Sequence, residues 1–395
     1  MADTKPPGGA SSIYPSYSPL LPLHTNPPSP DDDPTSSSSK PPLSTLINTH
    51  DFELAAQQTL TPKTWAFYSS AATDLHTKHR NASAYADIGL RPRVLINVKD
   101  VNISTSMLNQ PLSLPLFCAP AAMAAMVHPE GEKELARGCK KAGIAQCVST
   151  SASFSITDIV NSANPPTSSE RELPLFFQLY VDKVRTKSEA LLALVQSLGI
   201  KAIFLTVDAP VAGKREADER VRADESAGVV PMSGAVAKND SKGGSLGRIM
   251  AGYIDSTVSW ADIPWLRAHT SLPIVLKGIQ TSMDAQKAAA LGIDGILLSN
   301  HGGRSLDTSP SPILLLLELQ KNCPEVFDKL EVFVDGGVSR GTDIFKALCL
   351  GARSVGIGRG MLYALNYGEE GVEKYVDSKF VGPEPSPSFG ILISP

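Results

Sequence analysis

Short apolar runs that suit buried β-strands recur along the chain. In order they are 115–120 (PLFCAP), 145–150 (AQCVST), 174–180 (PLFFQLY), 202–207 (AIFLTV), 273–278 (PIVLKG), 295–300 (GILLSN), 331–337 (EVFVDGG) and 354–359 (SVGIGR). Between most of them apolar residues recur at helical spacing, as in 188–198, 283–291 and 342–350. Short buried strands that alternate with helices predict βαβ units and a parallel sheet. Eight such units over about 250 residues favour an α/β fold of the (β/α)8 TIM-barrel type over a Rossmann-like sheet, which would not use eight strand ends.

The two ends of the chain differ in composition from this central region. Residues 1–44 are rich in Pro, Ser, Thr and Asp and lack the apolar content of a core, which predicts a disordered arm. The barrel is then expected to occupy 45–380. The tail, 381–395, contains four prolines (Pro383, Pro385, Pro387 and Pro395), which cannot continue a helix.

One connection, 209–272, is much longer than the others, and its middle is rich in Gly and Lys. A long loop at the active face of a barrel commonly acts as a lid, although idle surface is the alternative.

Composition excludes several classes of protein. A net charge of −4 over 395 residues does not indicate a nucleic-acid-binding surface. No apolar run approaches the roughly 20 residues that a membrane span requires. The five cysteines lack metal or disulfide spacing and are expected to be reduced thiols, and no metal site is predicted. The N-terminus has neither the features of a secretory signal nor those of a mitochondrial presequence. We therefore expect an intracellular, soluble protein. The cytoplasm is the favoured compartment, and the peroxisome and the mitochondrion are alternatives.

Polar residues stand at the ends of the predicted strands, and a barrel gathers those ends on its catalytic face. They are Ser149, Gln178, Thr206, Lys277, Ser299, Asp335 and Arg359. The stretch LLSNHGGRSLD adds His301, which suits removal of a proton, and Arg304, which can hold a carboxylate through two parallel hydrogen bonds. Gly302 and Gly303 let the backbone approach a ligand closely. A turn with a structural histidine and a solvated arginine is the alternative.

This stretch is one of nine motifs that follow one another along the chain from about Thr45 to Tyr375. They are WAFYSSAATD, RPRVL, APAAMAAMVHPEGE, FFQLYV, LTVDAPVAGKREAD, LPIVLKGI, SNHGGRSLD, DGGVSRGTDIFKALCLGA and IGRG. Together they resemble the FMN-dependent α-hydroxy acid oxidase/dehydrogenase family, which includes glycolate oxidase and cytochrome-dependent L-lactate dehydrogenase. The resemblance implies an oxidoreductase that oxidises an L-2-hydroxy acid to a 2-oxo acid, with FMN taking two electrons. Oxygen or a separate electron carrier would then reoxidise the flavin, and a fused haem domain is not expected.

The resemblance also implies roles for individual residues. His301 matches the catalytic base, Asp208 the carboxylate that pairs with it, and Tyr180 the tyrosine whose hydroxyl faces the substrate. Tyr68, Arg215 and Arg304 match substrate-binding positions. Aromatic packing for the two tyrosines and a cap or turn for Asp208 are the alternatives.

For the cofactor, Lys277 matches the lysine near flavin N1 and the C2 carbonyl. Further matches lie along the ring, at Ser149, Gln178 and Thr206, and along its edge, at Pro120, Ala121, Ala122 and Met123. Ser299, at the end of a predicted strand, is also assigned to the cofactor-binding residues. The loops after the last two strands of such barrels usually hold a phosphate, which assigns Asp335, Gly336, Gly337, Gly358 and Arg359 to that end.

Two departures from the family pattern concern single residues. Ser339 stands where the family usually has an arginine that helps to hold the phosphate, so we expect weaker FMN retention. Ser305 replaces a common glutamine, a mild change. A third departure follows GVEKYVDSKF, where the family continues into a long final helix that closes the barrel but this chain turns to the proline-rich tail 381–395. The resemblance therefore implies that the final helix is missing, which would leave apolar surface on the last and first strands uncovered. Two rival interpretations stay open, namely an FMN-barrel isomerase and a weakly active or non-catalytic flavin-binding barrel. The sequence does not select the hydroxy acid, although Ser151, Ala122 and the long connection influence that choice, and it leaves a homo-oligomer open.

Overall fold

The computed structural model describes residues 40–97, 99, 101–166, 171–222, 231–234 and 244–380. Most of the predicted arm, the middle of the predicted lid and the tail 381–395 lie outside these residues. Within the arm, Lys40 and the residues after it are described and contact the barrel domain. The short helix η1 (Leu43–Thr45) is preceded by Pro41, whose carbonyl accepts a hydrogen bond of 2.8 Å from the hydroxyl of Tyr367.

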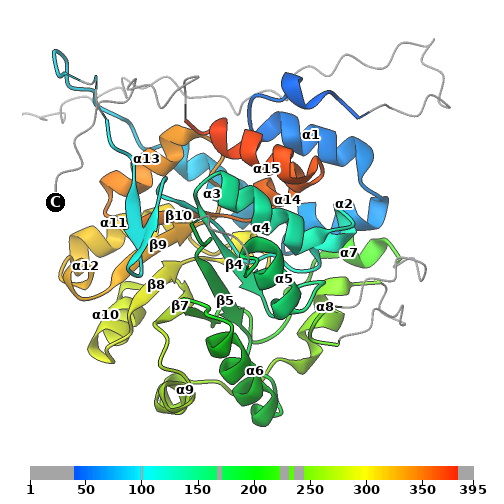
Figure 1. Ribbon diagram of the computed structural model, residues 1–395. Coiled ribbons are helices and arrows are strands. Elements are labelled where there is room, and N and C mark those ends of the chain that lie inside the picture. Colours follow the sequence, from blue (N-terminus) through cyan, green and yellow to red (C-terminus); the bar gives the residue numbers. More distant parts are fainter. Residues whose placement is uncertain are drawn as a thin grey trace, which may run out of the picture. The chain divides into compact units, whose positions relative to one another are not determined.

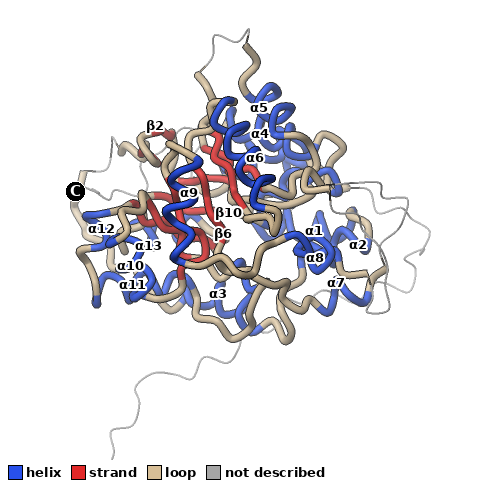
Figure 2. Tube along the Cα trace, turned by 90° about the horizontal axis from the view of Figure 1, so that it is seen from below, coloured by secondary structure: helices blue, strands red, loops and turns tan. Residues whose placement is uncertain are grey.

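Eight parallel strands close into a barrel, which confirms the predicted TIM-barrel fold (Figures 1 and 2). The strands are β3 (Leu116–Cys118), β4 (Ala145–Ser149), β5 (Leu175–Leu179), β6 (Ile203–Thr206), β7 (Ile274–Ile279), β8 (Gly295–Leu298), β9 (Glu331–Asp335) and β10 (Ser354–Ile357). Neighbours in the barrel follow the chain order, and β10 closes the barrel against β3. The register places Ser149 beside Gln178 and Thr206 beside Lys277, so the polar strand ends lie at one level of the barrel.

Helices surround the strands, as Figure 2 shows. Before the barrel come α1 (Thr49–Thr59), α2 (Pro62–Ser69), α3 (His76–Ala86) and an antiparallel pair, β1 (Thr105–Met107) and β2 (Gln110–Leu112). Between the barrel strands lie α4 (Gly131–Lys141), α5 (Ile156–Ala163), α6 (Arg185–Ser197), α7 (Glu216–Arg220), α8 (Leu246–Met250), α9 (Ile263–His269), α10 (Ser282–Ala290), α11 (Pro312–Asn322), α12 (Val326–Lys329) and α13 (Gly341–Cys349). The same region also contains short 3-10 helices: η2 (Ala124–Met126), η4 (Ala251–Tyr253), η5 (Trp260–Asp262) and η6 (His301–Gly303). The three predicted helices correspond to α6, α10 and α13.

Four phenylalanines fill the barrel interior beneath the strand ends. Phe117, Phe176, Phe204 and Phe333 are fully buried, and their neighbouring ring centroids are 5.5–6.2 Å apart. Large apolar side chains from different strands pack a barrel into a solid core rather than a pore. Gly356 makes room for this layer, since a Cβ there would lie 2.8 Å from the ring of Phe117. The core therefore supports the strand ends from below.

The prediction that apolar surface on the last and first strands is uncovered is wrong. Leu116 of β3 and Val355 of β10 are completely buried. Two helices follow β10, α14 (Arg359–Leu365) and α15 (Gly368–Asp377), and α15 packs against α4 and α14 (Figure 1). Val372 and Val376, one helical turn apart, give α15 a buried apolar face. The cover is thus complete before the proline-rich tail begins, and that tail lies outside the described residues. None of the helices in the described ranges is long and apolar enough to cross a membrane.

Candidate active site

A cavity of about 310 Å³ opens where the barrel strands end. It is lined by most of the residues predicted from the sequence: Tyr68, Pro120, Ala121, Ala122, Ser149, Gln178, Tyr180, Thr206, Arg215, Lys277, His301, Arg304, Asp335, Gly336, Gly337, Gly358 and Arg359. Three predicted residues, Met123, Asp208 and Ser299, do not line the cavity. All three are buried and contact residues that do line it.

His301 is held at the cavity by the loop that follows β8. Asn300 caps this turn, since its Oδ1 accepts a hydrogen bond of 3.1 Å from the backbone N–H of Gly303. His301 itself has a φ of +59°, a left-handed conformation that is uncommon for a non-glycine residue and recurs at functional sites. The strained turn directs the imidazole between two partners. Its Nδ1 lies 2.7 Å from Oδ1 of Asp208, and its Nε2 lies 3.4 Å from the hydroxyl of Tyr180.

Burial and neighbouring charges set the protonation of this pair. Burial is the main cause that lowers the pKa of His301 to about 4, and Lys277 acts in the same direction while Asp208 opposes it. For Asp208 burial acts to raise the pKa, but the interactions with His301 and Lys277 outweigh it and lower the pKa. At neutral pH the imidazole is therefore neutral and the carboxylate ionised. Nδ1–H donates to Asp208, which leaves Nε2 as a base that faces the hydroxyl of Tyr180.

Three partly buried arginines, Arg215, Arg304 and Arg359, supply positive charge to the cavity. Nη1 of Arg304 donates to the carbonyls of Phe67 and Tyr68 at 2.8 and 3.0 Å, and Nη2 of Arg359 donates to those of Ser70 and Gly302 at 3.1 and 2.8 Å. Burial lowers the pKa of each guanidinium, and for Arg304 the charges of Arg215 and Arg359 lower it further. An anion in this cavity would relieve that repulsion.

Tyr68 connects the arginine side of the cavity with the segment after β3. Its hydroxyl lies 2.8 Å from the carbonyl oxygen of Ala122 and 2.7 Å from that of Met123. Burial raises the pKa of this phenol well above its usual range, so it is a neutral donor. The backbone of the Ala122–Met123 segment is thereby fixed beside the cavity.

Another part of the cavity wall is a strip of linked polar side chains from neighbouring strands. Oγ of Ser149 donates to Oε1 of Gln178 at 3.1 Å, and Nε2 of Gln178 donates to Oγ1 of Thr206 at 3.0 Å. Next along the barrel, Nζ of Lys277 lies 3.4 Å from Oδ2 of Asp208. Burial acts to lower the pKa of Lys277, but Asp208 and Asp335 outweigh it and raise the pKa, so the lysine stays charged.

The residues near β9 and β10 leave room for a further group. Oδ1 of Asp335 is buried without a hydrogen-bond partner, and burial raises the pKa of that carboxyl. A Cβ on Gly337 would lie 2.1 Å from the carbonyl oxygen of Asn81, so only glycine allows this loop to press against α3. A Cβ on Gly358, in contrast, would meet open space. A polar strip, a fixed lysine and open space beside Arg359 fit a flat, polar-edged cofactor with an anionic end.

Several polar residues of the cavity were missed because they belong to helices before the barrel. Glu53 of α1 and Lys78 and Asn81 of α3 line the cavity. Asn81 and Asn300 exchange two amide hydrogen bonds, of 2.8 and 2.7 Å, and so tie the His301 loop to α3. No strand-end pattern marks these residues. Among the described residues, no group of His, Cys, Asp and Glu is arranged to hold a metal ion.

The fold and the cavity define a TIM-barrel protein whose cavity combines a strip of polar strand-end residues, a histidine–aspartate pair and a group of arginines. Residues 56–378 match the sequence profile of the FMN-dependent dehydrogenase family, and the chain belongs to that family. FMN is therefore its cofactor, and the polar strip, Lys277 and the open space at Gly358 fit this group.

Relatives of known name support this assignment. The chain is 44% identical over 347 residues to L-lactate dehydrogenase (cytochrome) of Saccharomyces cerevisiae, a match that covers 85% of this chain and 57% of the yeast protein. It is 39% identical over 335 residues to a peroxisomal (S)-2-hydroxyacid oxidase of Arabidopsis thaliana, covering 84% of this chain and 89% of the plant protein. The chain thus spans less than three-fifths of the yeast relative.

Solved structures show the same fold. The flavin-binding domain of baker's yeast flavocytochrome b2 matches with a TM-score of 0.76 and 42% identity, covering 87% of this chain and 82% of that domain. A mandelate oxidase bound to (S)-4-hydroxymandelic acid matches with a TM-score of 0.77 and 30% identity, covering 85% of this chain and 92% of the oxidase.

Proposed function

We propose that the protein oxidises an L-2-hydroxy acid, of the size of lactate or glycolate, to the 2-oxo acid. The observation that carries this proposal is the arrangement of His301, with Nδ1 bound to Asp208 and Nε2 facing the cavity between Tyr180 and the arginines. Such a site joins a neutral base with a receptor for a carboxylate. The names of the relatives, which include a lactate dehydrogenase and a 2-hydroxyacid oxidase, point to the same substrate class.

FMN supplies an acceptor for two electrons, and the residues of this chain do the rest. Arg304 and Arg215 bind the substrate carboxylate, and the carbonyls that hold Nη1 of Arg304 keep its guanidinium in a fixed plane. Nε2 of His301 receives the proton that the substrate loses. Asp208 then stabilises the imidazolium through the 2.7 Å contact, and the hydroxyl of Tyr180 orients the substrate beside it.

On the cofactor side, Ser149, Gln178, Thr206 and Lys277 would hold the flavin ring, with Pro120, Ala121 and Ala122 along its edge. The backbone of Gly336, Gly337 and Gly358 would approach the phosphate, near Arg359. Lys277, which stays charged, would offset negative charge on the flavin. Oxygen or a separate electron carrier would then accept the electrons. The cytoplasmic location of the protein stays a prediction.

The proposal is tested by the visible spectrum of the purified holoprotein under anaerobic conditions. We expect the flavin band to bleach on addition of L-lactate or glycolate and to stay unchanged with D-lactate. Return of the band when oxygen is admitted would identify an oxidase. Return only with an added one-electron acceptor would identify a dehydrogenase. A flavin band that no 2-hydroxy acid bleaches would refute the proposal.

A further inference from the structure

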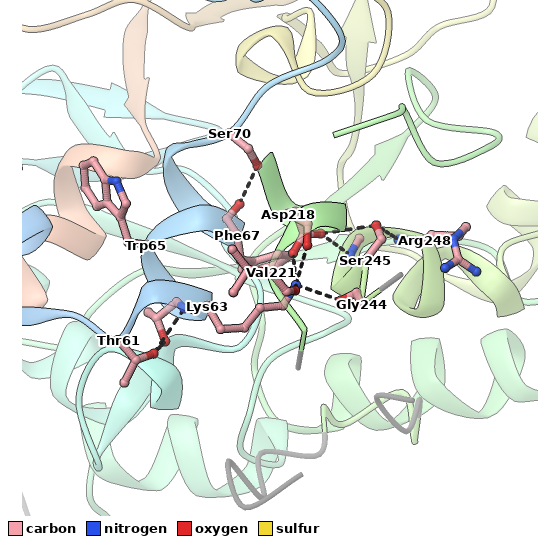
Figure 3. Close-up of polar contacts among 12 residues, drawn as sticks. Thr61, Lys63, Trp65, Phe67, Ser70, Asp218, Val221, Gly244, Ser245 and Arg248 are labelled. Carbon is pink, nitrogen blue, oxygen red and sulfur yellow. Dashed lines mark hydrogen bonds and ion pairs between the residues drawn. The ribbon is translucent and has the colours of Figure 1, made fainter. Parts of the chain in front are cut away.

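A buried ion pair lies beside the cavity and takes no part in the chemistry proposed above (Figure 3). Lys63 of α2 is 6% exposed and Asp218 of α7 is fully buried. Nζ of Lys63 lies 2.5 Å from Oδ1 of Asp218 and 2.6 Å from the carbonyl oxygen of the same residue. The carbonyls of Gly244 and Val221 lie 2.7 and 2.9 Å from the same nitrogen. One ammonium group thus joins three parts of the chain.

The second carboxylate oxygen of Asp218 is also occupied. Oδ2 accepts hydrogen bonds of 3.2 Å from Oγ of Ser245 and from the backbone N–H of Gly247, as the dashed lines of Figure 3 show for Ser245. Gly247 lies directly against Arg215, since a Cβ at Gly247 would come within 2.4 Å of Nη1 of that arginine. Asp218 therefore fixes the backbone on which the guanidinium of Arg215 rests.

The guanidinium of Arg215 makes one hydrogen bond to the part of the chain that the structure describes. Nε is 3.4 Å from the carbonyl oxygen of Arg304, and neither Nη1 nor Nη2 has a hydrogen-bond partner among the described residues. Arg215 directly precedes α7, and Asp218 lies within that helix, three residues after Arg215. Burial lowers the pKa of the Arg215 guanidinium, whereas the negative charge of Asp218 attracts Arg215 and acts to raise that pKa. If one oxygen of Asp218 lost its partner, that carboxylate would therefore compete with the substrate for Arg215.

From these contacts we propose that Lys63 and Asp218 are positioning residues for Arg215. Lys63 neutralises Asp218 and occupies its Oδ1, and Asp218 holds Gly247 in place. Arg215 is thereby kept beside the cavity with its terminal nitrogens available for a carboxylate. The inference rests on the proposed function in one respect, namely that Arg215 binds the carboxylate of the substrate.

The experiment uses the FMN-loaded protein and oxalate as the carboxylate probe, with binding followed by the change in the flavin spectrum. In Lys63→Met, Asp218 keeps its charge and attracts Arg215, so we expect the dissociation constant of oxalate and the KM for L-lactate to rise about tenfold. The value of kcat should change little, because a carboxylate contact that is equal in substrate and transition state affects KM alone. In Lys63→Met/Asp218→Asn the competing charge is gone, and most of the oxalate affinity should return.

A second pair of variants tests Asp218 when Lys63→Met does not fold. Asp218→Asn keeps an acceptor for the N–H of Gly247 and should bind oxalate nearly as the wild type does, whereas Asp218→Ala should bind it about tenfold more weakly. Arg267→Met is the control, because it breaks an ion pair with Asp294, which immediately precedes β8 and lies at the opposite end of the barrel from the cavity. It should leave oxalate binding unchanged.

Three results would overturn the inference: wild-type oxalate affinity in Lys63→Met, a double variant as weak as Lys63→Met, or equal affinities in Asp218→Asn and Asp218→Ala. Failure of the proposed function is seen separately. In that case the wild type itself binds oxalate but is not reduced by any 2-hydroxy acid.

Discussion

Replacement of Gly278 by alanine tests how the His301–Asp208 pair is held. Gly278 lies in β7, at a register shift against β8, and has a φ of +112°, a conformation that suits glycine alone. A Cβ at this position would lie 2.5 Å from Cβ of Asp208, 2.7 Å from its Cγ and 2.9 Å from its backbone nitrogen. Gly278 therefore allows Asp208 to approach β7 closely.

The magnitude follows from these separations. Overpacking of a well-packed site costs about 1–3 kcal/mol, and positive-φ strain adds about 1 kcal/mol, so the free energy of unfolding should fall by roughly 2–4 kcal/mol. Normal contact requires Asp208 to move by about 1 Å, which lengthens its 2.7 Å contact with His301 beyond hydrogen-bonding reach. A base without its orienting carboxylate loses most of its contribution, so kcat should fall about a hundredfold.

The assay is anaerobic stopped-flow reduction of the flavin by L-lactate, with a thermal melt of the same holoprotein. Gly199→Ala is the matched control, because Gly199 also has a positive φ, of +76°, but a Cβ there meets no atom within 4 Å. It should lose some stability and no activity. A Gly278→Ala protein that melts earlier yet is reduced at the wild-type rate would show that catalysis does not depend on the position of Asp208.

Four further predictions concern charge. Since burial lowers the pKa of His301 to about 4, kcat/KM should rise with pH through about 4 and then level off, and a midpoint near 6.5 would contradict this. A depressed pKa in the folded state also means that the contribution of His301 to stability is present above pH 6.5 and is lost as pH falls toward 4, which acid melts would detect. Lys277→Met leaves Asp208 buried without one of its partners and should destabilise the protein by about 3 kcal/mol in denaturant titrations. Ser339→Arg restores a cation near the predicted phosphate end and should lower the dissociation constant of FMN severalfold, with unchanged riboflavin binding as the control.

The strands and their polar ends could be predicted because both signals are local. The run 273–278, for example, corresponds to β7 at 274–279, and 145–150 corresponds to β4 at 145–149. Once the barrel is assumed, its geometry alone brings Ser149, Gln178 and Lys277 to one cavity, although they are distant in sequence.

The remainder of the site depends on contacts that no local pattern records. Lys63 and Asp218 are 155 residues apart, and nothing in PKTWAFYS marks the lysine as buried. Nothing in the sequence around Gly278 shows that its backbone has a positive φ or that the side chain of Asp208 packs directly against it. The cover of the barrel could not be predicted for a similar reason, because the proline-rich tail gives no sign that α15, just before it, already buries an apolar face against the barrel domain.

The C-terminal end of α2 explains how two partly buried arginines, Arg304 and Arg359, can lie side by side. The last carbonyls of a helix have no partner within it and carry partial negative charge. Arg304 and Arg359 both donate to carbonyls at this end, those of Tyr68 and Ser70 among them. Their charge is thus partly offset by the protein, whereas the terminal nitrogens of Arg215 have no such acceptor among the described residues. Under the proposed function, a substrate carboxylate would therefore gain most from Arg215. The helix α2, which also carries Lys63, would then help to set the position of that side chain.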